Sequence, residues 1–283
     1  MIEAHANPPH DEVSALVEAA RRHDGVAPLS EQSLLFLRHG GDGLGLTLRT
    51  AGGALAGYAH LGGGAGELVV HPEHRRQGHG TALLRALLDR EPGVQVWAHG
   101  DLPGATALAE RLGLERSRVL LQLRRPAADP LPPFELAPGV AVRAFEPGRD
   151  EERWLEVNRR AFADHPEQGA WTLDDVRNRE AEPWFDPAGF FLAERDGRLL
   201  GFHWTKVHPG GVGEVYVVGV DPAAQGLGLG RALTLIGLHH LRAAGQRQVM
   251  LYVDESNRAA VNLYESLGFA RHAVDTMYRH LGC

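Results

Sequence analysis

The 283-residue chain has a single cysteine, Cys283. One cysteine cannot form an internal disulfide framework, and such scarcity is typical of a reducing compartment, so we expect a cytoplasmic protein. No apolar run approaches the roughly 18 residues that a membrane-spanning helix requires. The opening stretch, MIEAHANPPHDE, has no apolar run and therefore does not resemble a signal peptide. We expect no membrane partner.

Basic residues are too few for a typical nucleic-acid-binding protein. Lysine and arginine number 29 against 36 aspartates and glutamates, so the formal net charge is −7. With no strongly basic stripe, we expect no nucleic-acid partner. The 16 histidines include two close groups, HPEH at 71–74 and HH at 239–240. Neither group has the helical spacing or the partner cysteines of a zinc site, so we expect no metal.

Glycine is abundant, and the clearest glycine-rich pattern occurs twice. HPEHRRQGHGTALLRALL begins at His71, and DPAAQGLGLGRALTLIGL begins at Asp221, an offset of 150 residues. An offset of that size indicates a duplicated domain rather than a solenoid repeat. The stretch RRPAADPLPPFELAPG, residues 124–139, carries five prolines and predicts a linker. We therefore expect one domain over 1–125, a linker over 126–139 and a second domain over 140–283.

Hydrophobic periodicity predicts similar elements in the two halves. In the first half we expect helices near 11–23, 78–90 and 104–112, and strands near 44–50, 54–61, 66–70, 94–98 and 118–123. In the second half we expect helices near 150–163, 172–180, 228–244 and 257–267, and strands near 140–145, 189–195, 199–207, 213–220, 248–253 and 270–278. Each half is thus predicted to be a mixed α/β sheet, mostly antiparallel, flanked by helices.

The second glycine loop is a candidate phosphate-binding loop. A strand ends at Val220, and glycines follow at 226, 228 and 230, just before a helix. Backbone N–H groups at a helix N-terminus are unpaired and can bind an anion, and glycine allows the close approach of a diphosphate. The loop has neither the Lys-Ser/Thr of a Walker A loop nor the spacing of a Rossmann fingerprint.

VVGVDPAAQGLGLGRALT resembles the R/Q-x-x-G-x-G/A signature of the GCN5-related N-acetyltransferases. The first copy matches it with Arg75, Gly78 and Gly80, and LYVDESNRAAVNLYESLGFARH resembles the family's next segment. The resemblance implies two tandem domains of this fold, with acetyl-CoA as co-substrate. The implied coenzyme-binding residues of the second half are Val218, Gly219, Val220, Gln225, Gly226, Leu227, Gly228, Leu229, Gly230, Arg231, Asn257, Arg258, Ala259, Ala260, Val261 and Asn262. Those of the first half are Leu68, Val69, Val70, Arg76, Gln77, Gly78, His79, Gly80 and Thr81.

Longer strings, AFADHPEQGAWT, HWTKVHP and GEVYVVGVDP, are similar to tandem members that acetylate the cysteinyl amine of a glucosaminyl-inositol, Cys-GlcN-Ins. This resemblance implies that small molecule as the acceptor. We expect a monomer. The implied substrate contacts are Glu31, Glu167, Lys206, Glu214 and Tyr252. Carboxylates can accept hydrogen bonds from the hydroxyls of such a ligand, and lysine can donate them.

Two residues of the second half suit the chemistry of acyl transfer. Alternation along the strand predicts that Glu214, Tyr216 and Val218 share one face, which makes Glu214 a candidate base. Tyr264 is a candidate acid for the leaving thiolate. The resemblance implies that the N–H of Val218 or Val220 stabilises the oxyanion.

The first half lacks these two groups. Aligning the halves on their Pro-led turns places Gly64 opposite Glu214, and Glu67 is expected on the other face. Aligning them on the later glycines, Gly113 and Gly268, places Ala109 opposite Tyr264. The second half is therefore predicted to be catalytic. The first half is predicted either to bind acyl-CoA without turning it over or to shape the substrate site.

Two other functions remain open at this point. A tandem acetyltransferase could act on another amine, such as an aminoglycoside or a peptide N-terminus. The chain could also be an acyl-CoA sensor in which both halves bind and neither reacts, although Glu214 and Tyr264 argue against a sensor.

Overall fold

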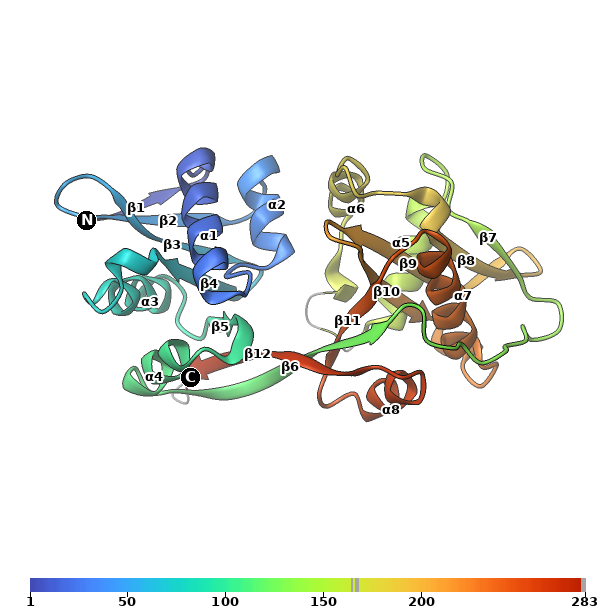
Figure 1. Cartoon of the computed structure of the whole chain (residues 1–283). Coiled ribbons are helices and arrows are strands. Elements are labelled where there is room, and N and C mark those ends of the chain that lie inside the picture. The colour runs from blue at the N-terminus through green and yellow to red at the C-terminus, as the bar shows by residue number, and fades with distance from the viewer. Residues whose placement is uncertain (164, 166–167, 281–283) are drawn as a thin grey trace. The chain divides into compact units, whose positions relative to one another are not determined.

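The computed structural model describes residues 1–163, 165 and 168–280, and the chain divides into two compact units. Unit 1 comprises Met1–Leu121 and the chain from Ala273 onward, and unit 2 comprises Gln122–His272. Two strands, β6 (Leu114–Pro126) and β12 (Ala270–His280), have residues in both units (Figure 1). The last strand of the chain thus contributes to unit 1. The linker and domain boundaries expected from the duplication stay a prediction.

Unit 1 is a mixed sheet with strand order β1-β2-β3-β4-β5-β12-β6. β4 and β5 are parallel, whereas β1 to β4 pair antiparallel in sequence order and β12 pairs antiparallel with β5. Its other strands are β1 (Ile2–His5), β2 (Leu44–Arg49), β3 (Leu55–Gly62), β4 (Ala65–Val70) and β5 (Gln95–Ala98). Its helices are α1 (His10–Asp24), α2 (Glu31–His39), α3 (His79–Arg90) and α4 (Pro103–Arg111).

Helices cover both faces of the unit 1 sheet. Successive side chains of a strand point to opposite faces, and β3 shows this at Tyr58 and Ala59. Ala59 packs in a cluster with Leu83 and Leu87 of α3, and Tyr58 packs in another with Val13 of α1. All five side chains are buried. The sheet is therefore the central layer, and the loop before α3 follows the carboxyl end of β4.

Unit 2 repeats this plan with strand order β6-β11-β10-β9-β8-β7. β10 and β11 are parallel, and β7 to β10 pair antiparallel in sequence order. The strands are β7 (Ala141–Ala144), β8 (Phe190–Arg195), β9 (Arg198–His208), β10 (Val212–Val220) and β11 (Gln248–Asp254). The helices are α5 (Glu151–Ala161), α6 (Leu173–Glu180), α7 (Leu229–Ala243) and α8 (Arg258–Ser266).

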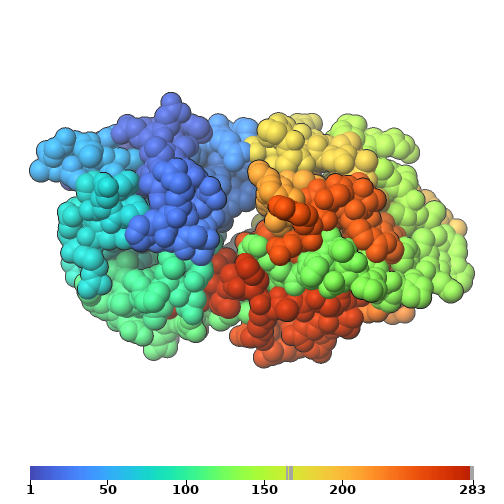
Figure 2. Space-filling model, in the orientation of Figure 1, coloured from blue at the N-terminus to red at the C-terminus, as the bar shows by residue number. Residues whose placement is uncertain are grey.

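The two faces of the unit 2 sheet carry different cores. On one face, Leu229 and Leu233 of α7 pack against Leu200. On the other, Trp154 of α5 packs edge-on against Phe202 and Trp204 of β9, with ring centroids 5.2 and 5.8 Å apart. Figure 2 shows α1 in blue on the surface of unit 1 and α8 in red on the surface of unit 2. The surface position of α8 agrees with its burial, since Val261 is the one buried residue of this helix.

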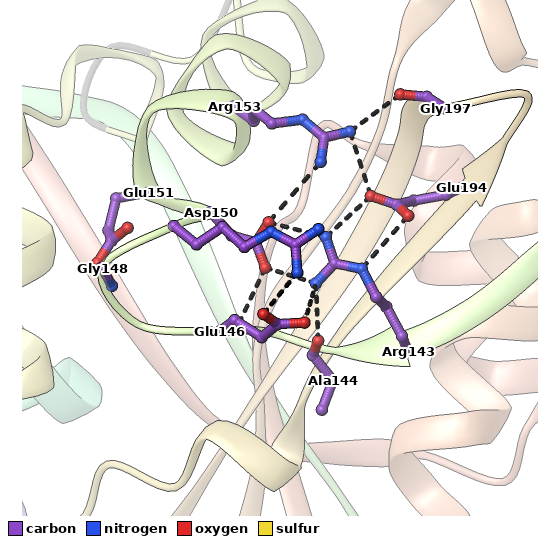
Figure 3. Close-up of polar contacts among 10 residues, drawn as sticks. Arg143, Ala144, Glu146, Gly148, Asp150, Glu151, Arg153, Glu194 and Gly197 are labelled. Atoms are coloured by element: carbon purple, nitrogen blue, oxygen red, sulfur yellow. Dashed lines mark hydrogen bonds and ion pairs between the residues drawn. The ribbon is translucent and has the colours of Figure 1, made fainter.

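An ion-pair network anchors the start of α5 (Figure 3). Arg143 of β7 donates to both carboxylate oxygens of Asp150, over 2.5 and 2.7 Å, and to Glu194 of β8 over 2.9 Å. Arg153 in the first turn of α5 also pairs with Glu194, at 3.2 Å. Bidentate pairs of this kind fix geometry as well as adding stability. The network therefore holds α5 against the sheet face that carries the site described below.

The predicted elements are confirmed, with ends shifted by a few residues, and two elements were missed. β1 is only four residues long, too short for alternation to be recognised. α2 has Ser30 as its N-cap, which accepts a hydrogen bond from the Ser33 N–H over 3.3 Å. Among the described residues, no helix is long and apolar enough to cross a lipid bilayer.

Candidate active site

The glycine loop of unit 2 presents bare backbone at the start of α7. β10 ends at Val220, a short 3₁₀ turn covers Pro222–Ala224, and Gly226 and Gly228 follow with φ of +85° and +69°. A Cβ at either glycine would meet no atom within 4 Å, so the space above the loop is open. The first bond back from α7 runs from the Ala232 N–H to the Gly228 carbonyl, over 3.2 Å. The amides just before it are therefore available to an anion.

Unit 1 has the same loop conformation. Arg76, which corresponds to Gly226, has φ of +62°, and Gly78 has φ of +85° just before α3. A left-handed arginine is uncommon. The shared backbone geometry confirms that the two loops are equivalent. Arg75 does not point into the loop as a free cation, since its guanidinium pairs with both oxygens of Asp24 over 2.6 and 2.7 Å.

In unit 1 the loop opens onto a cavity of about 530 Å³. The parallel pairing of β4 with β5 runs from Ala65 to Glu67, and beyond it the two strands line the cavity. Of the residues predicted to bind coenzyme in this half, eight line it: Leu68, Val69, Val70, Arg76, Gly78, His79, Gly80 and Thr81. The side chain of Gln77, the ninth, donates to the Glu73 carbonyl over 3.4 Å. Lining residues not foreseen include Trp97, His99 and Tyr278.

A buried cluster of charged side chains includes His99, which lines this cavity. His99 Nδ1 lies 3.0 Å from Asp275 Oδ2 and its Nε2 lies 3.7 Å from Glu67 Oε1. Burial alone would lower the pKa of His99, but the hydrogen bonds and charges of the two carboxylates outweigh it and raise that pKa to about 10. For Glu67, burial acts to raise the pKa, whereas His99 and Ser30 lower it to about 2. Sequence reasoning missed the cluster because Asp275 is 176 residues from His99.

In unit 2, the parallel pairing of β10 likewise covers only the first part of the strand. Its parallel pairing with β11 is described for Val212–Val215, while its pairing with β9 continues to Val220. The stretch from Tyr216 to Val220 therefore has one strand neighbour and leaves an edge to which an extended ligand could add. Val218, Gly219 and Val220, all predicted coenzyme contacts, lie on this stretch.

A β-bulge corrects one expectation about this strand. Pairing shifts between Val215 and Val217, so Tyr216 is the extra residue. A bulge interrupts the alternation of side chains. Beyond it, Val220 packs with the α7 cluster, and a Cβ at Gly219 would meet Ala161 of α5 at 3.2 Å. Glu214 and Tyr216 thus share the α5 face, but Val218 lies on the α7 face, and the prediction that all three share one face is wrong.

Strand register brings two predicted substrate contacts together. Glu214 lies directly opposite Lys206 on β9 and beside Met250 on β11, so Tyr252 follows on the same face. Glu214 is 6% exposed and Lys206 8% exposed, whereas Tyr252 is 41% exposed. The Tyr252 hydroxyl accepts a hydrogen bond from Gln122 Nε2 over 2.7 Å.

Aromatic rings hold the buried lysine. Lys206 Nζ lies 4.2 Å from the ring centroid of Trp184 and 5.1 Å from that of Tyr216. Arg179 of α6 stacks on Trp171, with its guanidinium carbon 3.8 Å from the ring centroid, and donates to the Tyr216 hydroxyl over 2.8 Å. Cation–π contacts are strengthened when the cation is desolvated. The α5 face therefore places cations and aromatic rings beside the carboxylate of Glu214.

Glu214 has a partner that the sequence analysis did not single out. His208 Nε2, at the end of β9, lies 2.6 Å from Glu214 Oε2. The signal was present in the string HWTKVHP, whose residues 204, 206 and 208 alternate toward one face, but the predicted strand ends at 207 and so excludes His208.

The remaining predicted residues lie as follows. Asn257 caps α8, since its side chain accepts from the Ala260 N–H over 3.1 Å. Tyr264 is half-buried in α8 with its ring 5.8 Å from that of Phe269, and burial raises the pKa of Tyr264 to about 12. Glu31 begins α2 in unit 1, and Glu167 lies outside the described residues.

The start of α7 is tied to the end of α8. Arg231, in the first turn of α7, donates to Ser266 Oγ over 3.0 Å. This contact brings the helix that carries Tyr264 to the helix that carries the loop amides. In the described part of the chain, no group of three or more histidine, cysteine, aspartate or glutamate side chains could hold a metal ion.

Sequence profiles match both halves. The Acetyltransferase (GNAT) family profile matches residues 152–269, and an Acetyltransferase (GNAT) domain profile matches residues 42–115. A tandem GNAT protein from the clavulanic acid biosynthesis pathway superposes with a TM-score of 0.71 at 20% identity, covering 99% of this chain and 98% of that one. A GCN5-related N-acetyltransferase from Sphaerobacter thermophilus superposes with a TM-score of 0.66 at 25% identity, covering 98% and 95%. The fold and site thus define a tandem GNAT acetyltransferase.

Similar sequences identify the family within the GNAT acetyltransferases to which the chain belongs. The chain is 67% identical to a mycothiol acetyltransferase of Thermomonospora curvata over 281 residues, covering 96% of this chain and 94% of the relative. It is 61% identical to a mycothiol acetyltransferase of Thermobispora bispora, covering 94% of each chain. At this level of identity and coverage, the chain belongs to the mycothiol acetyltransferase family.

Proposed function

We propose that this protein transfers the acetyl group of acetyl-CoA to the cysteinyl amine of Cys-GlcN-Ins and so forms mycothiol. The observation that carries the proposal is an arrangement of three features in unit 2. They are a phosphate-binding loop, the unpaired edge of β10 beyond Val215, and a buried carboxylate on β10, the strand that runs into that loop. Membership of the mycothiol acetyltransferase family supports the choice of acceptor. The lone cysteine supports a cytoplasmic location, and we propose a monomer.

The loop and strand edge hold the donor. Amides from Gly226 to Arg231 bind the diphosphate of the coenzyme, and the exposed edge of β10 aligns its pantetheine arm. The rest of the predicted coenzyme set, Asn257 to Asn262 at the start of α8, binds the adjoining part of that arm. The N–H of Val218 or Val220 donates to the thioester oxygen as negative charge builds on it, which is the strongest single contribution in many acyl transfers.

Glu214 acts as the base. The amine nitrogen attacks the thioester carbon, the N–C bond forms, and the C–S bond breaks as the coenzyme thiolate departs. Glu214 accepts the proton that the amine loses. An α-amino group has a reference pKa near 8, so a modest base suffices near neutral pH.

Tyr264 assists the leaving group. Burial raises the pKa of Tyr264 to about 12, so full proton transfer from its phenol to a thiolate whose conjugate acid has a reference pKa near 8.5 costs roughly 5 kcal/mol. That cost is too large for a separate step. We therefore assign Tyr264 a hydrogen bond to the departing thiolate, with its proton moving only as the C–S bond breaks.

The acceptor lies over the α5 face of unit 2. Lys206 donates to its hydroxyls, while Glu214 and Tyr252 contact the cysteinyl end. Unit 1 binds acyl-CoA in its 530 Å³ cavity and does not turn it over. Gly64 and Ala109 stand there in place of the base and the acid, and Ala109 is buried in the core.

Thiol release from acetyl-CoA tests the proposal. We expect release with Cys-GlcN-Ins and none with GlcN-Ins, which lacks the cysteinyl amine. Glu214→Gln should lower kcat by roughly 100-fold or more, most strongly at low pH where the amine is protonated. Glu152→Gln, an exposed change on α5, is the matched control and should keep full activity. Release with aminoglycosides but not with Cys-GlcN-Ins would refute the proposed acceptor.

A further inference from the structure

His208 occupies a defined place beside the proposed base. It is the last residue of β9 and pairs with Val212 across the hairpin, which sets its ring next to Glu214. Nε2 lies 2.6 Å from Glu214 Oε2. The Glu214 side chain is 8% exposed, whereas the His208 side chain is 30% exposed. The histidine therefore lies on the solvent side of the carboxylate.

The contact has a consequence for the carboxylate. An ionised carboxylate only accepts hydrogen bonds, so a proton on His208 Nε2 must be the donor in this pair. One donor at Oε2 fixes the rotation of the carboxylate and leaves Oε1 with its lone pairs unengaged by the histidine. Orientation of this kind is what a base needs to meet the proton it removes.

Other charged and titratable groups on this face make contacts of their own. Lys206 is opposite Glu214, but its ammonium lies over the rings of Trp184 and Tyr216. Arg179 of α6 donates to the Tyr216 hydroxyl. Tyr252 of β11 lies two residues beyond the partner of Glu214. Arg247, before β11, donates to the Gly210 carbonyl in the hairpin turn over 2.8 Å.

We infer that His208 is the positioning residue for Glu214 in acetyl transfer. It donates from Nε2 to Oε2, so that Oε1 accepts the amine proton, and it takes no part in bond formation itself. This inference rests on the proposed function, because it requires Glu214 to be the base.

Three substitutions at position 208 separate positioning from other roles. The side-chain amide of glutamine can place a donor where histidine places Nε2, the amide of asparagine is one methylene shorter, and leucine has no donor. We expect His208→Gln to keep kcat within about threefold, and His208→Asn and His208→Leu to lose roughly 10- to 100-fold, the range for a misplaced catalytic group. The loss should grow as pH falls, as for Glu214→Gln, and the KM for acetyl-CoA should stay constant.

Steady-state rates between pH 6 and 9, with both substrates varied, provide the readout. Equal losses in the glutamine, asparagine and leucine variants would overturn the inference, as would wild-type rates in all three alongside an inactive Glu214→Gln. A fully active Glu214→Gln would instead overturn the proposed base, whatever the position-208 variants do. His272→Gln, an exposed change in the same unit, is the control and should leave rates and pH dependence unchanged.

Discussion

Replacing His99 by glutamine removes the cation between two buried carboxylates of unit 1. Glu67 and Asp275 are 5% and 8% exposed, and each lies against the imidazole ring. The substitution takes the imidazolium charge of His99 away from both carboxylates. Breaking a buried pair by removing one partner costs about 3–5 kcal/mol. The donors that remain are the N–H groups of Ser30 and Gly100, at 2.7 and 2.9 Å, and the Ser33 hydroxyl, at 3.0 Å; they put the expected loss near the lower end.

The pKa of His99 gives a second measure of the stability that this residue contributes, and it gives the direction in which that stability changes with pH. A rise from 6.5 to about 10 corresponds to at most roughly 5 kcal/mol of stability, at about 1.4 kcal/mol per unit. Because the folded state holds the proton more tightly, this contribution is complete below pH 6.5 and is lost as pH rises toward 10. The wild-type protein should therefore lose stability over that window, and His99→Gln should lack this part of the slope.

Urea unfolding at pH 6 and at pH 9.5, followed by circular dichroism, measures the difference. We expect the free energy of unfolding of His99→Gln to be about 3 kcal/mol lower than that of the wild type at pH 6. This difference should become much smaller at pH 9.5. Hydrogen exchange should assign the loss to β4 and β5 in unit 1, with unit 2 protected as before. An equal difference in the free energy of unfolding at both pH values, or faster hydrogen exchange confined to unit 2, would refute the reasoning.

Three further changes test unit 2. Tyr264→Phe should lower kcat by about 10- to 100-fold with the KM for acetyl-CoA nearly constant; equal loss of coenzyme affinity, measured by calorimetry, would assign Tyr264 a packing role. Lys206→Met keeps an unbranched stem against Trp184 and should raise the KM for Cys-GlcN-Ins by about tenfold or more, because a hydrogen bond to a charged group is lost; an unchanged KM would remove Lys206 from the acceptor site. Gly228→Ala forces a Cβ into a left-handed backbone at φ +69° and should raise the KM for acetyl-CoA by about tenfold, whereas Gly52→Ala, at a position outside the left-handed region where a Cβ would meet only Thr50 Oγ1 at 3.8 Å, should not.

Local sequence determined the elements and the loops. Apolar spacing along ten to fifteen residues decides whether a segment buries one face as a helix or a strand, so α7 and β10 could be predicted with ends close to those observed. The glycines at 226 and 228 predicted a loop whose backbone a ligand can approach closely, and both adopt left-handed backbone in the structure. The repeat also predicted that unit 1 would carry the same turn, and it does so even with Arg76 in place of a glycine.

Contacts between distant segments were decided only by the tertiary structure. The bulge at Tyr216 depends on how β10 pairs with β9, and it reverses the face of Val218. The contact between His208 and Glu214 follows from the register of one hairpin. Asp275 reaches His99 because β12 joins the sheet of unit 1, far along the chain from β5. Such pairings depend on which surfaces the whole chain can bury together, and no local pattern of residues encodes that choice.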